Sequence, residues 1–241
     1  MAQRARAGRQ AVKAGTQDGH DGQAYDAGPW VPRTDDLGEL GRAAAGCRGC
    51  PLYAAATQTV FGEGPGRARV VLVGEQPGDR EDRAGEPFVG PAGGLLRRAL
   101  EEAGLDPSEV YLTNAVKHFK FTVPEGGKRR IHKAPDLREM TACRPWLTAE
   151  LAAVRPGLVV ALGATAGRAL LGGPFRVGEH RGVLRPFPSP DGPGAGGAAA
   201  LPDAQFLATV HPSAVLRAPD RDAAYRGLVA DLRIAASALQ G

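Results

Sequence analysis

The chain has 241 residues, of which 43% are hydrophobic, and a formal net charge of +4. This length and composition fit one globular α/β domain with appendages and exclude a largely disordered protein. No apolar run reaches the about 18 residues of a membrane-spanning helix, and no apolar stretch follows the N-terminal arginines. We therefore expect a cytoplasmic protein without a membrane segment. A pI near 9.2 allows a nucleic-acid partner without requiring one.

The first part of the chain predicts a tail and then a cysteine pair. Residues 1–33 mix Gly, Ala, Gln, Asp and Arg without periodicity, which predicts a disordered tail before a single domain at residues 34–241. A helix over residues 37–45 leads into Cys47-Arg-Gly-Cys50. Three cysteines cannot form a paired disulfide framework, so the pair indicates a metal or cluster site. The spacing alone leaves an iron–sulfur cluster, zinc and buried free thiols open.

The remaining chain alternates strand and helix patterns. Four short apolar runs are typical of strands buried on both faces of a parallel sheet, at residues 69–74, 110–114, 158–162 and 205–210. Helical patterns occupy residues 95–103, 136–154, 165–171 and 223–239, and Gly104 is placed to end the first of them. Residues 186–203 are rich in Pro, Gly and Ala and predict a surface loop. The predicted fold is a three-layer α/β/α domain with a central four-stranded parallel sheet.

Polar residues follow three of the predicted strands. Glu75 and Gln76 come after the first strand, Asn114 ends the second, and His211 follows the fourth. Pro212 holds the residue before it extended, so the imidazole of His211 can project toward the sheet edge. Because ligands of open α/β sheets bind beyond the carboxyl ends of the strands, we expect these side chains to converge on one site.

A basic segment lies between the second and third strands. Residues 117–133 contain six Lys or Arg residues against one acid, Glu125, a local net charge of +5. Lys128, Arg129 and Arg130 stand together, two residues before His132. Such a charge favours binding to the phosphates of a nucleic acid, and the histidine invites a chemical role.

These motifs resemble the uracil-DNA glycosylase superfamily, and its iron–sulfur branch most closely, over about residues 37 to 239. The resemblance rests on GEQPGDREDRAGEPFVGPAG at 74–93, the Thr-Asn pair at 113–114 and HPSAVLR at 211–217. The string KRRIH at 128–132 is the hallmark loop of the X-type enzymes of this branch. Ordinary iron–sulfur members carry a cysteine soon after the Thr-Asn strand, where this chain has His118.

The resemblance implies a cofactor and its ligands. A [4Fe–4S] cluster would be held by Cys47, Cys50, His118 and Cys143, with the imidazole in place of the fourth thiolate. Its expected role is structural, because it would tie the N-terminal helix to the segment that carries the basic loop.

The resemblance also implies a uracil pocket. Phe88 would stack on the base, Asn114 would bind its N3–H and O4 edge, and His211 would donate to O2 and stabilise the departing uracil anion. Glu75 would stabilise the cationic sugar or act as a base. Gln76 would shape the pocket or position the attacking group. We expect only structural roles for the other histidines, His20 and His180.

The implied partner is uracil-containing DNA, with single strands preferred because an unpaired base is flipped at little cost. Its phosphates would contact Lys128, Arg129 and Arg130. The loop that follows the fourth strand would reach the space left by the base through Ser213, Leu216 and Arg217. We expect the protein to act as a monomer.

The most specific prediction concerns His132. A neutral imidazole is a competent nucleophile, so the resemblance implies that His132 attacks C1′ and leaves the protein covalently linked to DNA in a single turnover. The alternatives are a conventional hydrolytic glycosylase and a non-catalytic iron–sulfur module that only binds nucleic acid. A nucleotide-binding enzyme is disfavoured, because GPAGG at 90–94 lacks the Lys and Ser/Thr of a P-loop.

Overall fold

A computed structural model describes residues 25–188 and 201–240. Its central sheet has the strand order β2-β1-β5-β7-β6 and consists of β1 (Val70–Gly74), β2 (Val110–Asn114), β5 (Leu158–Leu162), β7 (Gln205–Thr209) and β6 (Arg185–Pro186). The first four strands pair in parallel, which confirms the predicted sheet. The fifth strand, β6, pairs antiparallel with β7 and was not predicted, since two residues beside a Pro- and Gly-rich segment carry no strand pattern.

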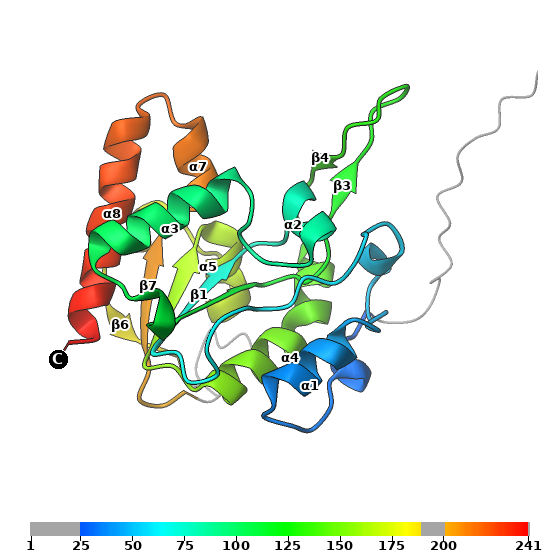
Figure 1. Cartoon of the computed structure of the whole chain (residues 1–241), viewed down its shortest axis with the longest axis horizontal. Coiled ribbons are helices and arrows are strands. Elements are labelled where there is room, and N and C mark those ends of the chain that lie inside the picture. Colours follow the sequence, from blue (N-terminus) through cyan, green and yellow to red (C-terminus); the bar gives the residue numbers. More distant parts are fainter. Residues whose placement is uncertain (1–24, 189–200, 241) are drawn as a thin grey trace, which may run out of the picture.

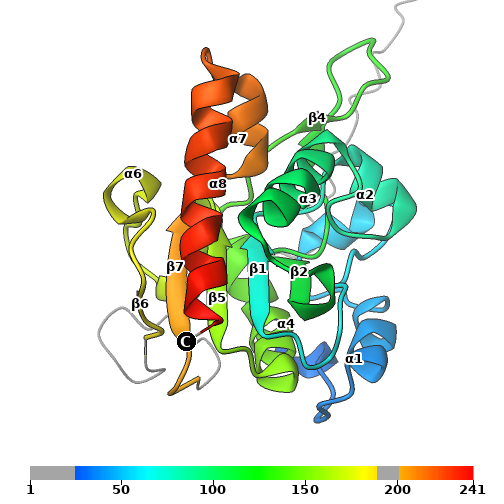
Figure 2. The same ribbon diagram turned by 60° about the vertical axis from the view of Figure 1, so that its left-hand side comes forward.

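Helices cover both faces of the sheet (Figures 1 and 2). The longer ones are α1 (Leu37–Ala44), α3 (Pro91–Ala103), α4 (Leu137–Val154), α5 (Ala164–Leu171) and α8 (Arg221–Ala238). Val70 and Leu72 pack with the apolar residues of α3 and α8, whereas Val71 and Val73 pack with those of α4 and α5. Because successive strand side chains point to opposite faces, this alternation builds the predicted three layers.

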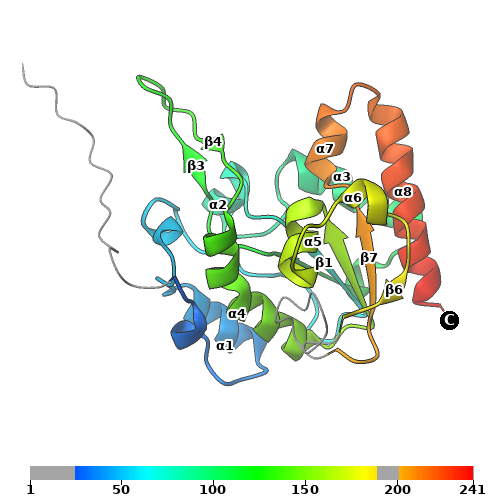
Figure 3. The same cartoon turned by 180° about the vertical axis from the view of Figure 1, so that it is seen from behind.

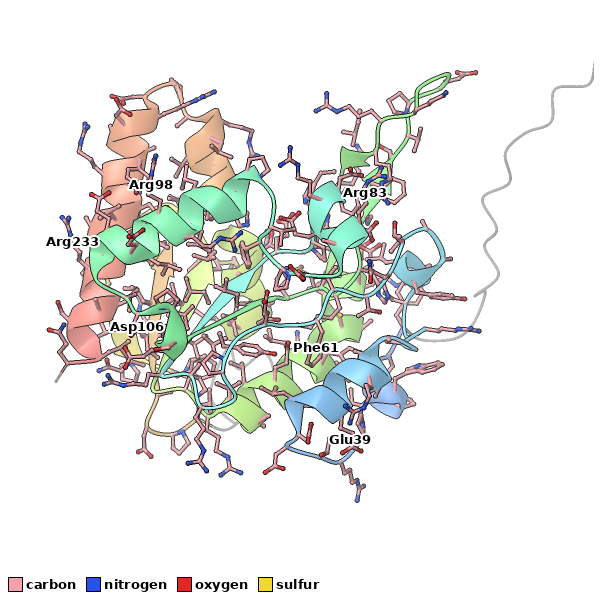
Figure 4. All side chains as sticks on the ribbon, viewed as in Figure 1. Glu39, Phe61, Arg83, Arg98, Asp106 and Arg233 are labelled. Carbon is pink, nitrogen blue, oxygen red and sulfur yellow. The ribbon has the colours of Figure 1, made fainter. Side chains whose placement is uncertain are left out.

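Helix boundaries follow local signals where the sequence supplies them. Gly104 ends α3 with a left-handed φ of 80°, as predicted. Asp136 caps α4, and its carboxylate accepts from the N–H of Glu139 while the Glu139 carboxylate accepts from the N–H of Asp136. Figure 4 shows Arg98 on α3 and Arg233 on α8, two helices that pack together.

Several short elements were not predicted. They are α2 (Asp79–Ala84), α6 (Val177–His180), α7 (Pro212–Arg217) and the single-turn helices Gly28–Trp30, Pro51–Ala54 and Pro107–Glu109. Each is too brief to show a helical period. Within residues 25–188 and 201–240, no helix is long and apolar enough to cross a membrane.

The end of the predicted tail packs on the domain. Ala27 is 2% exposed, and its N–H donates to the carbonyl of Ala142 in α4 at 2.9 Å. Residues 25–33 therefore belong to the folded part, whereas the rest of the predicted tail, with His20, lies outside the described residues. Residues 189–200 of the predicted loop at 186–203 also lie outside them.

The basic segment forms a hairpin arm. Strand β3 (Phe121–Thr122) pairs antiparallel with β4 (Ile131–His132), and residues 123–130 connect them. The arm projects beyond α2, at the edge of the molecule that the carboxyl ends of the parallel strands face (Figures 1 and 3). His132 therefore lies at the base of an arm rather than in an irregular loop.

Candidate active site

A cavity of about 610 Å³ opens beyond the carboxyl ends of the parallel strands. Eight of the residues singled out from the sequence line it: Glu75, Gln76, Phe88, Asn114, His132, His211, Ser213 and Arg217. Lys128, Arg129 and Leu216 are not among the lining residues. Side chains from three strand ends, from the loop before α3 and from the hairpin thus share one site.

Backbone geometry brings Phe88 and Asn114 together over Gly74. Phe88 has a left-handed φ of 57°, a conformation that costs free energy for a non-glycine residue and that recurs at functional sites. A Cβ on Gly74 would meet the Asn114 amide oxygen and would lie 2.7 Å from Phe88 Cζ. Only glycine therefore lets both side chains approach the end of β1 so closely.

His211 is held as a neutral hydrogen-bond donor. Its Nδ1 accepts from the Ser213 backbone N–H at 3.1 Å and lies 2.7 Å from the Ser213 hydroxyl. The pKa of His211 is lowered to about 4, chiefly by burial and in smaller part by Arg217 and His132. With Nδ1 accepting, the neutral ring carries its proton on Nε2. The ring stacks at 6.4 Å from that of Phe88.

His132 lies beside Glu75. Its Nε2 is 3.3 Å from Glu75 Oε1, and its side chain is 48% exposed. Burial lowers its pKa, Glu75 opposes that shift, and Arg217 adds to it. The net lowering favours the neutral imidazole near pH 7, the form that has a free lone pair.

Gln76 fastens the hairpin to the sheet. Its Nε2 donates to the carbonyls of Lys120 and Lys133 at 3.1 and 3.0 Å, and its Oε1 accepts from the Lys120 N–H at 3.1 Å. These bonds use both amide protons and join the residues that flank β3 and β4. A residue predicted to shape the pocket thus ties down the strand that carries His132.

Arg130 has another role than the predicted phosphate contact. Its Nε donates to Asp79 Oδ1 at 2.5 Å and its Nη1 to Asp82 Oδ2 at 2.6 Å, and its side chain is only 12% exposed. The guanidinium also lies 4.9 Å from the ring centroid of Phe121. Arg130 therefore anchors the hairpin to α2, whereas Lys128 and Arg129 stay exposed toward its tip.

Glu81 was missed by sequence reasoning. Its carboxylate accepts from the N–H of Gly90 at 2.7 Å and from that of Gly78 at 3.1 Å, so it closes the loop that carries Phe88. Glu81 stands three residues after Gly78, the position of the glutamate in a capping box, but glycine has no side chain to complete the reciprocal bond. The position of the glutamate was the available signal, and it does not reveal the contact with Gly90.

The four predicted cluster ligands line one small cavity, of about 10 Å³: Cys47, Cys50, His118 and Cys143. Within the part of the chain that the structure describes, no three His, Cys, Asp or Glu side chains are grouped as ligands of a single metal ion. A four-iron cluster is larger than one ion, so its ligands stand farther apart. Burial raises the pKa of Cys50 to about 11 and that of Cys143 to about 12; bound cations would offset this penalty on the thiolates.

Hydrogen bonds around this cavity fit a cluster. Trp146 Nε1 donates to Cys47 Sγ at 3.2 Å, and the Lys117 N–H donates to Cys143 Sγ at 3.3 Å, the kind of contact that tunes cluster thiolates. The Thr59 hydroxyl donates to the Ala44 carbonyl at 2.9 Å, so it accepts from His118 Nε2 at 2.9 Å. That arrangement leaves the Nδ1 lone pair of His118 free to bind iron.

A buried ion pair connects this cavity with the end of β2. Lys117 Nζ, on a side chain 1% exposed, pairs with Glu150, which is 0% exposed. The same ammonium donates to the Asn114 carbonyl at 2.7 Å and to the Thr113 hydroxyl at 2.6 Å. The residue whose N–H binds Cys143 Sγ thus also fixes the strand end that carries Asn114.

His180, for which only a structural role was expected, stacks on Phe175 at 4.8 Å between ring centroids. It does not line the cavity described above.

Comparison with known proteins shows the family of this chain. Residues 61–233 match the family model of the uracil DNA glycosylase superfamily. The chain is 35% identical to the type-4 uracil-DNA glycosylase of Pyrobaculum aerophilum over 184 residues, which are 76% of this chain and 86% of that protein. It is 42% identical to the type-4 enzyme of Thermotoga maritima over 120 residues, or 50% of this chain and 58% of the relative. The match to the Archaeoglobus fulgidus type-4 enzyme is 38% over 129 residues, 54% and 60% of the two chains.

Proposed function

Because the chain belongs to the uracil-DNA glycosylase superfamily, we propose that it removes uracil from DNA by breaking the N-glycosidic bond. Its similarity to three type-4 uracil-DNA glycosylases supports this activity. The cavity supports it too, because it joins an aromatic face, an amide and a neutral histidine donor in a space of about 610 Å³. A flipped base is recognised by stacking and by hydrogen bonds to its edge, and these groups can supply both.

In this proposal Phe88 stacks on the flipped uracil and Asn114 binds its N3–H and O4 edge. An amide offers a donor and an acceptor side by side, which suits uracil and mismatches cytosine. His211 directs Nε2–H at O2, where negative charge develops as uracil leaves. A neutral donor fits this task, because its hydrogen bond strengthens as the oxyanion forms.

We further propose that His132 captures the sugar. The C1′–N1 bond of deoxyuridine breaks and its electron pair leaves with uracil, while the lone pair of a ring nitrogen of His132 forms a bond to C1′. The imidazole becomes a cation, and the Glu75 carboxylate stabilises or accepts its N–H proton. The observation that carries this proposal is that His132 lines the uracil cavity with Nε2 3.3 Å from Glu75 Oε1.

The partner in this proposal is uracil-containing DNA, with single strands preferred. Lys128 and Arg129 on the exposed hairpin tip would contact phosphates and supply affinity without sequence specificity. Ser213, Leu216 and Arg217 on α7 would face the emptied position of the flipped base. We expect the protein to act on DNA as a monomer.

We propose that Cys47, Cys50, His118 and Cys143 hold a [4Fe–4S] cluster. When bound, it would supply a rigid cross-link, and in principle one-electron chemistry, beside the uracil pocket. Lys117 would connect this cross-link to the pocket, because its N–H donates to Cys143 Sγ and its Nζ donates to the Asn114 carbonyl. The brown colour and the iron content of freshly purified protein test the assignment.

A denaturing gel tests the activity. The purified protein, incubated with a single-stranded oligonucleotide that contains one uracil, should give a band that stays shifted after denaturation. His132→Gln should abolish the band while free abasic DNA appears; an unchanged band would refute the nucleophile assignment. Repeated turnovers without a band would support the hydrolytic alternative, and no uracil release from any DNA would revive the binding-module alternative.

A further inference from the structure

Among the four predicted parallel strands, β5 is the one for whose carboxyl end no functional residue was predicted. The chain turns there through Gly163, which has a left-handed φ of 92°, and enters α5. A Cβ on Gly163 would lie 3.0 Å from the Cβ of His211, so the start of α5 is fixed closely against that histidine. Leu162, Gly163, Ala164 and Thr165 all line the uracil cavity.

Thr165, the second residue of α5, is bound to Glu75. Its side chain is buried, with 6% of the residue exposed, and its hydroxyl donates to Glu75 Oε2 in a short hydrogen bond. The other carboxylate oxygen, Oε1, is the one that lies 3.3 Å from His132 Nε2. Thr165 thus holds one oxygen of Glu75 while the second faces the imidazole.

The direction of this hydrogen bond follows from its neighbours. Arg168, one turn further along α5, places Nη2 3.4 Å from the Thr165 oxygen, and a guanidinium can only donate. An ionised carboxylate can only accept. The single hydroxyl proton of Thr165 therefore points at Glu75, and the α5 N-terminus adds its partial positive charge on the same side.

We propose that Thr165 is a positioning residue that orients Glu75 toward His132. The inference rests on the proposed function, since it gives Glu75 a supporting residue for the attack by His132. Thr165 touches neither the base nor the sugar in this scheme; it acts through Glu75 alone.

Two variants separate the hydroxyl from the packing of the side chain. Thr165→Val keeps the branched shape and the volume, whereas Thr165→Ser keeps the hydroxyl. The readouts, with the full chain and a uracil-containing single strand, are the single-turnover rates of uracil release and of adduct formation from about pH 5 to about pH 8. Circular dichroism melting curves verify that both variants fold.

We expect the single-turnover rates to fall in the valine variant and not in the serine variant. Thr165→Val should slow the reaction at neutral pH by about tenfold or more, the effect of a hydrogen bond to a charged group. Thr165→Ser should stay within about threefold of the wild type and keep its profile.

A double-mutant cycle with Glu75→Ala makes the test specific. If Thr165 acts through Glu75, adding Thr165→Val to Glu75→Ala should cost no further rate. Additive losses, equal losses in the valine and serine variants, or a valine variant with the wild-type rate would each overturn the inference while the proposed function stands. A wild-type protein that releases no uracil would overturn the proposed function itself, and this inference with it.

Discussion

Replacing Arg130 with methionine should release the hairpin from α2 while most of the aliphatic stem stays in place. Asp82, whose side chain is 0% exposed, would keep two contacts from the Thr57 N–H, at 3.0 and 3.2 Å, but would lose the guanidinium. Removal of one partner from a buried ion pair costs about 3–5 kcal/mol. The remaining contacts favour the lower end of this range.

The second partner of Arg130 adds little to this estimate. Asp79 is 41% exposed, so solvent screens its pair to at most about 1 kcal/mol. A loss of about 3 kcal/mol in hairpin docking lowers the docked population by up to roughly a hundredfold. Since His132 follows Arg130 by two residues, we expect the single-turnover rate of adduct formation to fall by up to that factor.

The assay compares Arg130→Met with Arg129→Met, whose side chain is exposed. Arg130→Met should bind DNA within about threefold of the wild type and keep its salt dependence, because the guanidinium is already engaged by Asp79 and Asp82. Arg129→Met should bind more weakly, with a salt slope reduced by about 1, and should keep its rate at saturating DNA. An Arg130→Met variant that reacts at the wild-type rate, or that loses salt dependence as Arg129→Met does, would refute the reasoning.

Two further predictions concern the pocket. Arg217→Gln removes a charge that lowers the pKa of His132, so this pKa should rise. Because protonation removes the nucleophilic lone pair, the acidic limb of the adduct-formation rate should move to higher pH. An unmoved limb would count against this electrostatic coupling. Gly74→Ala should drive Asn114 and Phe88 apart and lower the single-turnover rate of uracil release at least about tenfold. A variant with the wild-type rate would show that the pocket accommodates the methyl group.

The fold could be predicted where burial leaves a pattern. The strands β1 and β5 are apolar throughout because both of their faces are covered, and β2 and β7 are apolar over their central residues. Gly104 stands where α3 needs a left-handed residue. The strands β3, β4 and β6 have two residues each, too few for any periodicity. Their pairing is set by tertiary contacts, among them the clamp that Gln76 forms on the hairpin.

The site was only partly predictable for a related reason. Glu75, Asn114 and His211 follow strands, and their position at strand ends indicates a pocket. Arg130 looks like its neighbours in a basic run, and only the fold brings it to two acids of α2. Thr165 is an ordinary helix residue in the sequence, because its partner is 90 residues away.

Peptide mapping of the trapped complex tests the central claim most directly. After digestion of a protein–DNA adduct formed on a uracil-containing single strand, mass spectrometry should place the nucleotide remnant on the peptide that contains His132, and fragmentation should place it on the imidazole. A remnant on any other residue, or an intact unmodified His132 peptide in a reaction that has released stoichiometric uracil, would contradict capture by this histidine.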